Sequence, residues 1–100
     1  MELHFSPETT VKVAEGRQLS TTLAGEVVIL DIERGVYYGL DAVGAELWSR
    51  LQSPSTVGDL VDHVVNRYDV ARSTADADIQ SLLRELLALG LIERDDAAAA

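Results

Sequence analysis

The two histidines are the first side chains to consider for chemistry, because imidazole binds metals and transfers protons near neutral pH. His4 lies near the N-terminus, and His63 lies beside Asp59 and Asp62 in a segment of helical period. Asp59 stands four residues before His63, so the two side chains share a helix face. A first-row metal site usually gathers three or four ligands, more than these residues supply. We interpret His63 as part of a solvated, ion-paired helix face and expect no metal or other cofactor.

Asp76 and Asp78 resemble the paired carboxylates of a general acid–base site. Both lie near the predicted N-terminus of a helix, where negative charge is favourable, and that placement is sufficient to explain them. The chain has no cysteine, phosphate-binding loop, dinucleotide fingerprint or nucleophile elbow. Its serines have no credible base in the sequence. We therefore expect no catalytic residues and a protein that is not an enzyme.

The segment Val36–Leu40 could bind a partner through backbone hydrogen bonds, without side-chain chemistry. Its sequence, Val-Tyr-Tyr-Gly-Leu, is typical of a β-strand, and it is the last strand predicted in the first half of the chain, which favours a sheet edge. It contains no lysine or proline to block pairing. Tyr37 and Tyr38 would point to opposite faces, one into the core and one beside a groove. The edge is either covered by a helix of the domain or open to a peptide that adds as a strand.

The charge of the chain argues against nucleic-acid and membrane partners. Seventeen acidic against eight basic residues give a formal net charge of −9, which repels phosphates and anionic lipid. A DNA-binding winged helix needs cations on its recognition helix, yet the predicted third helix, Ser73–Leu89, carries one arginine, Arg84, against three acidic residues. A winged-helix DNA-binding regulator is therefore a distant alternative.

The size of the chain suits a single domain. It has 100 residues, of which 47% are apolar, and we expect one domain over residues 1–93 and a flexible tail over 94–100. The N-terminus lacks the basic start and apolar run of a signal peptide, and no segment approaches the roughly 20 apolar residues that span a bilayer. We expect a cytoplasmic protein.

The first half of the chain predicts strands joined by glycine-containing turns. The strands are expected at Leu19–Leu23, Glu26–Asp31 and Val36–Leu40. They form an antiparallel three-stranded meander, whose central strand is a continuous β-branched run that indicates burial on both faces. Residues 1–18 hold one more short segment of this kind, Thr9–Val13, as an extra strand or an arm.

The second half of the chain predicts three amphipathic helices. They are expected at Ala42 to about Leu51, Val57–Tyr68 and Ser73–Leu89. Asp41 is expected to cap the first helix, and Trp48 to pack in the core. Leu91 and Ile92 are expected to fold back onto the core after Gly90. The order predicts an α+β fold, a winged helix-turn-helix-like arrangement of a three-stranded meander followed by three helices.

Several short motifs follow one another in a characteristic order between residues 19 and 93. They are Asp31–Gly35, Leu40-Asp41, Gly44-Ala45, Leu47-Trp48, Thr56-Val57, Leu60-Val61, Tyr68-Asp69, Asp76–Ile79, Leu86 and Gly90–Ile92. An acidic hairpin with a glycine thus leads into a tyrosine-bearing strand, followed by a Gly-Ala pair and an apolar-Trp pair. This ordered set resembles PqqD-like domains, although each motif alone is common.

The resemblance implies a recognition element for ribosomally made, post-translationally modified peptides. In such domains the leader of the precursor pairs with the third strand and lies in a groove against the third helix. Carried over to this chain, the leader-binding residues would be Val36, Tyr37, Tyr38, Gly39, Leu40, Asp76, Ile79, Leu82, Leu83 and Leu86. Spacing alone does not separate helix residues that line the groove from those that fill the core.

The Tyr-Tyr-Gly-Leu strand is similar to that of the free-standing leader-binding subunit of split lasso-peptide systems. This implies a non-catalytic adaptor whose partners are a precursor leader peptide, a separate cysteine-protease leader peptidase and an ATP-dependent cyclase. The same kind of domain serves radical SAM peptide-modifying enzymes. A leader-binding chaperone for such an enzyme is therefore the alternative.

Overall fold

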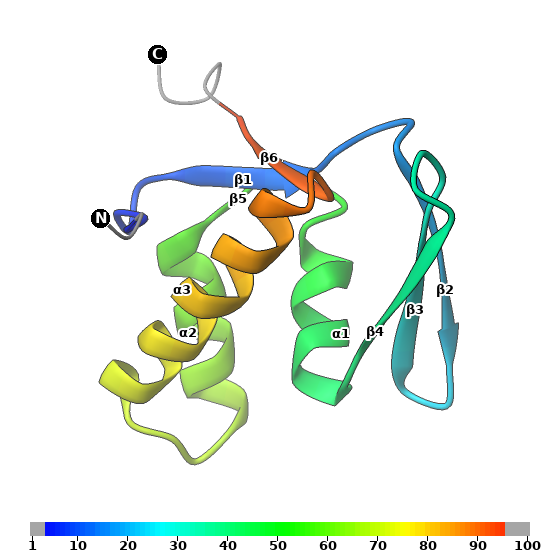
Figure 1. The fold of residues 1–100 in the computed structure, drawn as a ribbon. Helices are drawn as coiled ribbons and strands as arrows, with labels where there is room; N and C mark the ends of the chain where they lie inside the picture. The colour runs from blue at the N-terminus through cyan, green and yellow to red at the C-terminus, as the bar shows by residue number, and fades with distance from the viewer. Residues whose placement is uncertain (1–3, 96–100) are drawn as a thin grey trace.

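The computed structural model describes residues 4–95 of the chain (Figure 1). Its elements are β1 (Thr10–Val13), β2 (Gln18–Leu23), β3 (Glu26–Asp31), β4 (Val36–Leu40), α1 (Ala42–Arg50), β5 (Ser55–Thr56), α2 (Val57–Arg67), α3 (Arg72–Ala88) and β6 (Ile92–Arg94). The strands form two three-stranded antiparallel sheets, ordered β2-β3-β4 and β5-β1-β6. The α+β prediction is confirmed. The parts of the predicted arm and tail at residues 1–3 and 96–100 lie outside the described residues.

The predicted meander is the β2-β3-β4 sheet, and its turns explain its register. Ala24 and Gly25 form a two-residue turn in which both φ angles are positive, 52° and 82°. Positive φ at both positions matches the twist of the strands that such a turn joins. At the next turn, the Gly35 N–H donates to the Asp31 carbonyl at 2.8 Å, with a φ of 66° at Gly35. These two turns bring β3 to the centre of the sheet.

The two faces of β3 are buried to different extents. Val27 and Ile29 point toward α1 and are buried, whereas Val28 and Leu30 on the opposite face are half-buried. The prediction that β3 is buried on both faces is therefore wrong, because no element within residues 4–95 packs over the outer face of this sheet. Antiparallel sheets commonly have one face on the core and the other in solvent, and this sheet is of that kind.

The second sheet was only partly anticipated. β1 is its central strand, so the segment predicted as an extra strand or an arm is a strand. Arg94 pairs with Val11, and the Asp95 N–H donates to the Thr10 carbonyl at 2.9 Å, so residues 94 and 95 belong to the sheet and not to a flexible tail. β5 and β6 have two and three residues, too few for a period to be visible in the sequence.

The helices begin at the polar residues that the sequence offers, with one exception. Asp41 Oδ1 accepts a hydrogen bond from the Gly44 N–H at 3.1 Å and caps α1, and Thr56 Oγ1 accepts one from Asp59 at 3.1 Å and caps α2. α3 begins one residue before the predicted start and has no side-chain cap. None of the three helices has both the length and the apolar content that crossing a bilayer requires.

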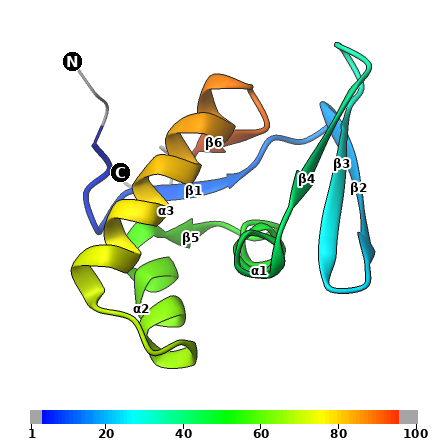
Figure 2. The same cartoon turned by 60° about the horizontal axis from the view of Figure 1, so that its bottom comes forward.

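The core lies between the helices and the inner faces of both sheets. Helix α1 separates the β2-β3-β4 sheet from the α2–α3 pair, and the second sheet covers one end of the helices (Figures 1 and 2). Trp48 is buried, and its Nε1 donates to Ser20 Oγ at 3.1 Å, which ties α1 to β2. Leu91 and Ile92 are buried, as predicted. The sheet edge formed by β4 is thus held close to the helices.

Candidate functional site

β4 is an outer strand of its sheet. It pairs with β3 from Asp31↔Val36 to Val27↔Leu40, and within residues 4–95 no strand pairs with its other edge. β2 is the opposite outer strand, and it lies on the side away from α1 (Figure 2). Of the two open edges, that of β4 lies nearer to α1 and α3. The backbone groups along an open edge are available to another strand.

The two tyrosines of β4 point to opposite faces of the sheet. Tyr37 stands opposite Leu30 on the outer face and is 69% exposed. Tyr38 stands opposite Ile29 on the inner face and packs against the core. The divergence of the two side chains was predicted, but neither is among the residues that line the groove described next.

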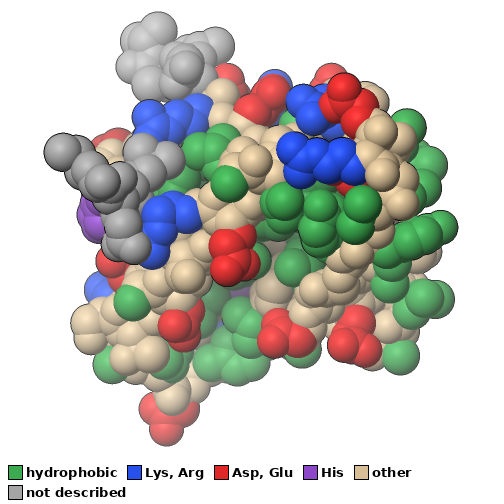
Figure 3. Space-filling model, in the orientation of Figure 1, with side chains coloured by type: hydrophobic (Ala, Val, Ile, Leu, Met, Phe, Trp, Pro, Cys, Tyr) green, Lys and Arg blue, Asp and Glu red, His purple; other side chains and the backbone are tan. Residues whose placement is uncertain are grey.

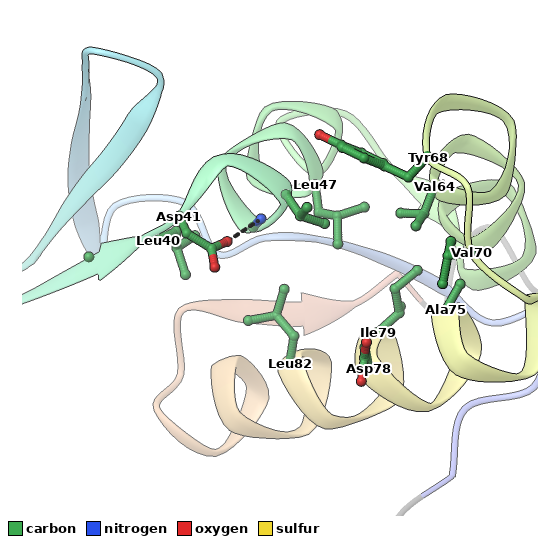
Figure 4. Close-up of a pocket in the computed structure, with 13 residues that line it drawn as sticks. Leu40, Asp41, Leu47, Val64, Tyr68, Val70, Ala75, Asp78, Ile79 and Leu82 are labelled. Carbon is green, nitrogen blue, oxygen red and sulfur yellow. Dashed lines mark hydrogen bonds between the residues drawn. The ribbon is translucent and has the colours of Figure 1, made fainter.

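An apolar groove of about 550 Å³ lies beside β4 (Figures 3 and 4). The end of β4 and the start of α1 form one wall, α3 forms the other, and α2 with the segment after it closes one end. The lining residues are Gly39, Leu40, Asp41, Val43, Gly44, Leu47, Val64, Tyr68, Val70, Ala75, Asp78, Ile79 and Leu82. Backbone pairing and apolar side-chain contacts are therefore available side by side.

One face of α3 lines this groove. Its members are Ala75, Asp78, Ile79 and Leu82, which are spaced at i, i+3, i+4 and i+7. Two of them, Ile79 and Leu82, were predicted from the sequence together with Gly39 and Leu40 of β4. Val36, Tyr37 and Tyr38 belong to the same strand but lie outside the groove lining.

The remaining predicted residues of α3 do not reach the groove. Leu83 and Leu86 are buried in the core, with exposed fractions of 0% and 4%. Asp76 lines a separate hollow between the N-terminal segment, α2 and the start of α3, and it accepts a hydrogen bond from Gln80 Nε2 at 3.5 Å. These three residues were carried over from the family resemblance, and the spacing along the helix does not distinguish residues that line the groove from those that fill the core.

Several groove residues were not predicted. Val43 and Leu47 come from α1, Val64 from α2, and Tyr68 and Val70 from the segment between α2 and α3. In the sequence they are ordinary apolar positions of helices and a connection. Val70, an apolar residue in an otherwise polar connection, was the one residue whose sequence context could have indicated a place in the groove.

A charged cluster supports the closed end of the groove. The Tyr68 hydroxyl donates to Glu46 Oε2 at 2.8 Å, Arg67 forms an ion pair with Glu46, and His63 Nε2 lies 3.6 Å from Glu46 Oε2. Glu46, not the predicted Asp59, is thus the acidic neighbour of His63. Within residues 4–95, no three His, Asp or Glu side chains are grouped so that they could hold a metal ion.

The interactions within the cluster shift the pKa values of Glu46 and Arg67. The Tyr68 hydrogen bond, with Arg67 and His63 nearby, lowers the pKa of Glu46 below its ordinary value of 4.5, although desolvation opposes the shift. The hydrogen bond to Tyr68 and the charge of Glu46 raise the pKa of Arg67. Both groups are therefore charged near neutral pH, and the hydroxyl of Tyr68 is held by an ionised acceptor.

We expect the cluster to contribute stability that acid removes. A carboxyl whose pKa is lowered by folding stabilises the protein above its unfolded pKa, and this contribution disappears as the pH falls through the folded pKa. Urea unfolding at pH values from about 6 down to about 3 should therefore show a smaller acid-induced loss for Glu46→Gln than for the wild type. Glu26→Gln, at an exposed residue of β3, is the control and should behave like the wild type. Equal losses in all three proteins would contradict the role of Glu46.

Comparisons with known proteins bear on this site. The family model described as coenzyme PQQ synthesis protein D (PqqD) matches residues 26–92, which include β4, α1, α2 and α3. A solved structure described as TbiB1 in complex with the TbiA(beta) leader peptide matches with a TM-score of 0.76 and 35% sequence identity, over 82% of this chain and 94% of that chain. No curated protein sequence matches the chain significantly.

Proposed function

The chain belongs to the PqqD family, and from this membership and the geometry of β4 we propose that it binds the leader region of a ribosomally synthesised precursor peptide. The leader adds as a strand to the open edge of β4 and places apolar side chains in the groove beside it. The proposed role is binding, without catalysis. The matching structure of TbiB1, described as a complex with a leader peptide, supports a peptide ligand of this kind.

The observation that carries the proposal is the open edge of β4 directly beside the apolar groove. Strand addition supplies backbone hydrogen bonds worth about 0.5 to 1.5 kcal/mol each, and pockets for alternate side chains select the sequence. The open edge of β2 does not have the apolar groove beside it, because no residue of β2 lines that groove. We therefore place the leader on β4.

The proposed destination of the bound leader is a separate enzyme. We propose a lasso-peptide system, in which the chain acts in the cytoplasm and delivers the leader to a cysteine-protease leader peptidase that works with an ATP-dependent cyclase. The family description, which refers to coenzyme PQQ synthesis, favours a second candidate, a chaperone for a radical SAM peptide-modifying enzyme. Co-purification of the chain with the enzyme encoded beside it would decide between the two.

The test of leader binding is a titration. The probe is the fluorescently labelled N-terminal half of the short peptide encoded nearest the gene, followed by fluorescence anisotropy. We expect saturable binding with a Kd on the order of nanomolar to micromolar, because ordering a flexible peptide opposes association. Random duplex DNA of similar length is the control and should not bind to an acidic chain. Absence of peptide binding at about 50 µM would contradict the proposal.

A further inference from the structure

Two carboxylates border a groove that is otherwise almost entirely apolar. Asp41 lies where β4 meets α1, and Asp78 lies across the groove on α3 (Figure 4). Both residues are exposed. The one other polar side chain among the lining residues is Tyr68, whose hydroxyl already donates to Glu46. The groove therefore offers a ligand apolar contacts along its floor and negative charge on both walls.

The charges of this acidic pair, Asp41 and Asp78, are not neutralised within the groove. Its lining contains no lysine or arginine. Asp41 uses Oδ1 to cap α1, which leaves Oδ2 for a ligand, and within residues 4–95 no hydrogen bond or ion pair engages the Asp78 side chain. Glu46, at the closed end, differs because Arg67 and Tyr68 hold its carboxylate.

The surroundings of the acidic pair strengthen its field at the groove. Low-dielectric walls concentrate field lines, and carboxylates of one sign without nearby cations attract a positive ligand group. The whole chain carries a formal net charge of −9, so its long-range field has the same sign. A ligand with acidic side chains at these positions would be repelled, which is a contribution to specificity.

Resting on the proposed leader binding, we propose that Asp41 and Asp78 make the groove selective for leaders that carry a lysine or arginine beside their apolar anchor. In an added strand, alternate side chains point to the same face. The cation therefore stands an even number of residues from the apolar residue that enters the groove. Arginine is favoured over lysine, since its planar guanidinium can bind one carboxylate with two parallel hydrogen bonds.

The test is a selection from a displayed library of random peptides of about twelve residues, long enough to run past β4. The full chain is compared with the double variant Asp41→Asn, Asp78→Asn, in which asparagine preserves the cap of α1. The matched control, Glu15→Gln with Asp59→Asn, changes the net charge equally at exposed positions outside the groove lining. Thermal unfolding verifies that all three proteins are folded.

We expect peptides selected on the wild type to be enriched in Arg or Lys at an even spacing from an apolar residue. Such peptides should bind the groove double variant about tenfold more weakly, and the control variant as tightly as the wild type. Raising the salt from about 0.1 M to about 1 M, which shortens the Debye length from about 10 Å to about 3 Å, should remove most of that difference.

Three results would overturn the inference, and the third is distinguishable from the first two because it also removes leader binding. Suppose that the selected peptides bind Leu82→Asp more weakly than the wild type but are not enriched in lysine or arginine. This result would overturn the proposed selectivity and leave leader binding intact. The same conclusion would follow if both double variants lost affinity equally. If the selection recovers no peptide whose binding is weakened by Leu82→Asp, the proposed function and this inference are both overturned.

Discussion

Leu82→Asp is expected to weaken leader binding by at least about 100-fold while the protein stays folded. Leu82 is partly buried on the groove face of α3, so its replacement leaves the main core in place. The apolar anchor of a bound leader would pack against the new carboxylate and remove water from it, at a cost of several kcal/mol. Each 1.4 kcal/mol corresponds to about a tenfold change in Kd, which the anisotropy titration measures directly.

Leu23→Asp is the matched control for this substitution. Leu23 is 60% exposed at the end of β2, the outer strand opposite β4, and it is not among the residues that line the groove. It receives the same chemical change. We expect its Kd to equal that of the wild type. A large loss of affinity in Leu23→Asp with none in Leu82→Asp would move the leader to the edge of β2 and reject the proposed site.

The next residue along α3 is expected to behave in the opposite way. Leu83 is fully buried, and Leu83→Ala should cost about 2 to 5 kcal/mol of the free energy of unfolding through lost contacts and the cavity left behind. For a chain of this size, about 1 kcal/mol shifts Tm by roughly 4 to 8 °C, so Tm should fall by about 10 °C or more. The protein that stays folded should bind the leader normally.

Leu82→Ala provides the comparison for Leu83→Ala. It removes the same atoms from a neighbouring, partly exposed position, so it should lower Tm less and affinity more. Calorimetry and peptide titration of the two variants measure both quantities. Weak binding by Leu83→Ala at unchanged Tm would show that Leu83 faces the leader, as its place among the sequence-predicted site residues implied.

The contrast between these neighbours explains how far the sequence could predict the site. Apolar periodicity identified α3, but Leu82 and Leu83 have the same type and differ in exposure only through the neighbours that pack on each face. The family resemblance placed Asp76 in the site and left Asp78 out, whereas in the structure Asp78 lines the groove and Asp76 lines the separate hollow. The strand Val36–Leu40 was predictable because its composition and its position after the central strand indicate a sheet edge.

The fold was predictable to a similar extent. The meander and the three helices have clear periods and turn signals, and Asp41 caps α1 as its position indicated. The second sheet brings together β1, β5 and β6, which lie far apart in the chain; the sequence indicated β1 as an extra strand or an arm, but β5 and β6 are too short to show a period. The groove was harder to predict, because its closed end is built from α2 and the connection after it, where Val70 was the one local signal in the sequence.

The most direct test of strand addition is amide hydrogen exchange of the protein with and without the leader, followed residue by residue by NMR. An added strand should protect alternate amides of β4, because in an edge strand every second N–H points away from the neighbouring strand. The exposed amides of β2 should exchange as fast as before. Protection of alternate residues within Val36–Leu40 is the result we predict; unchanged exchange along β4, with protection on β2 or around the hollow that contains Asp76, would contradict it.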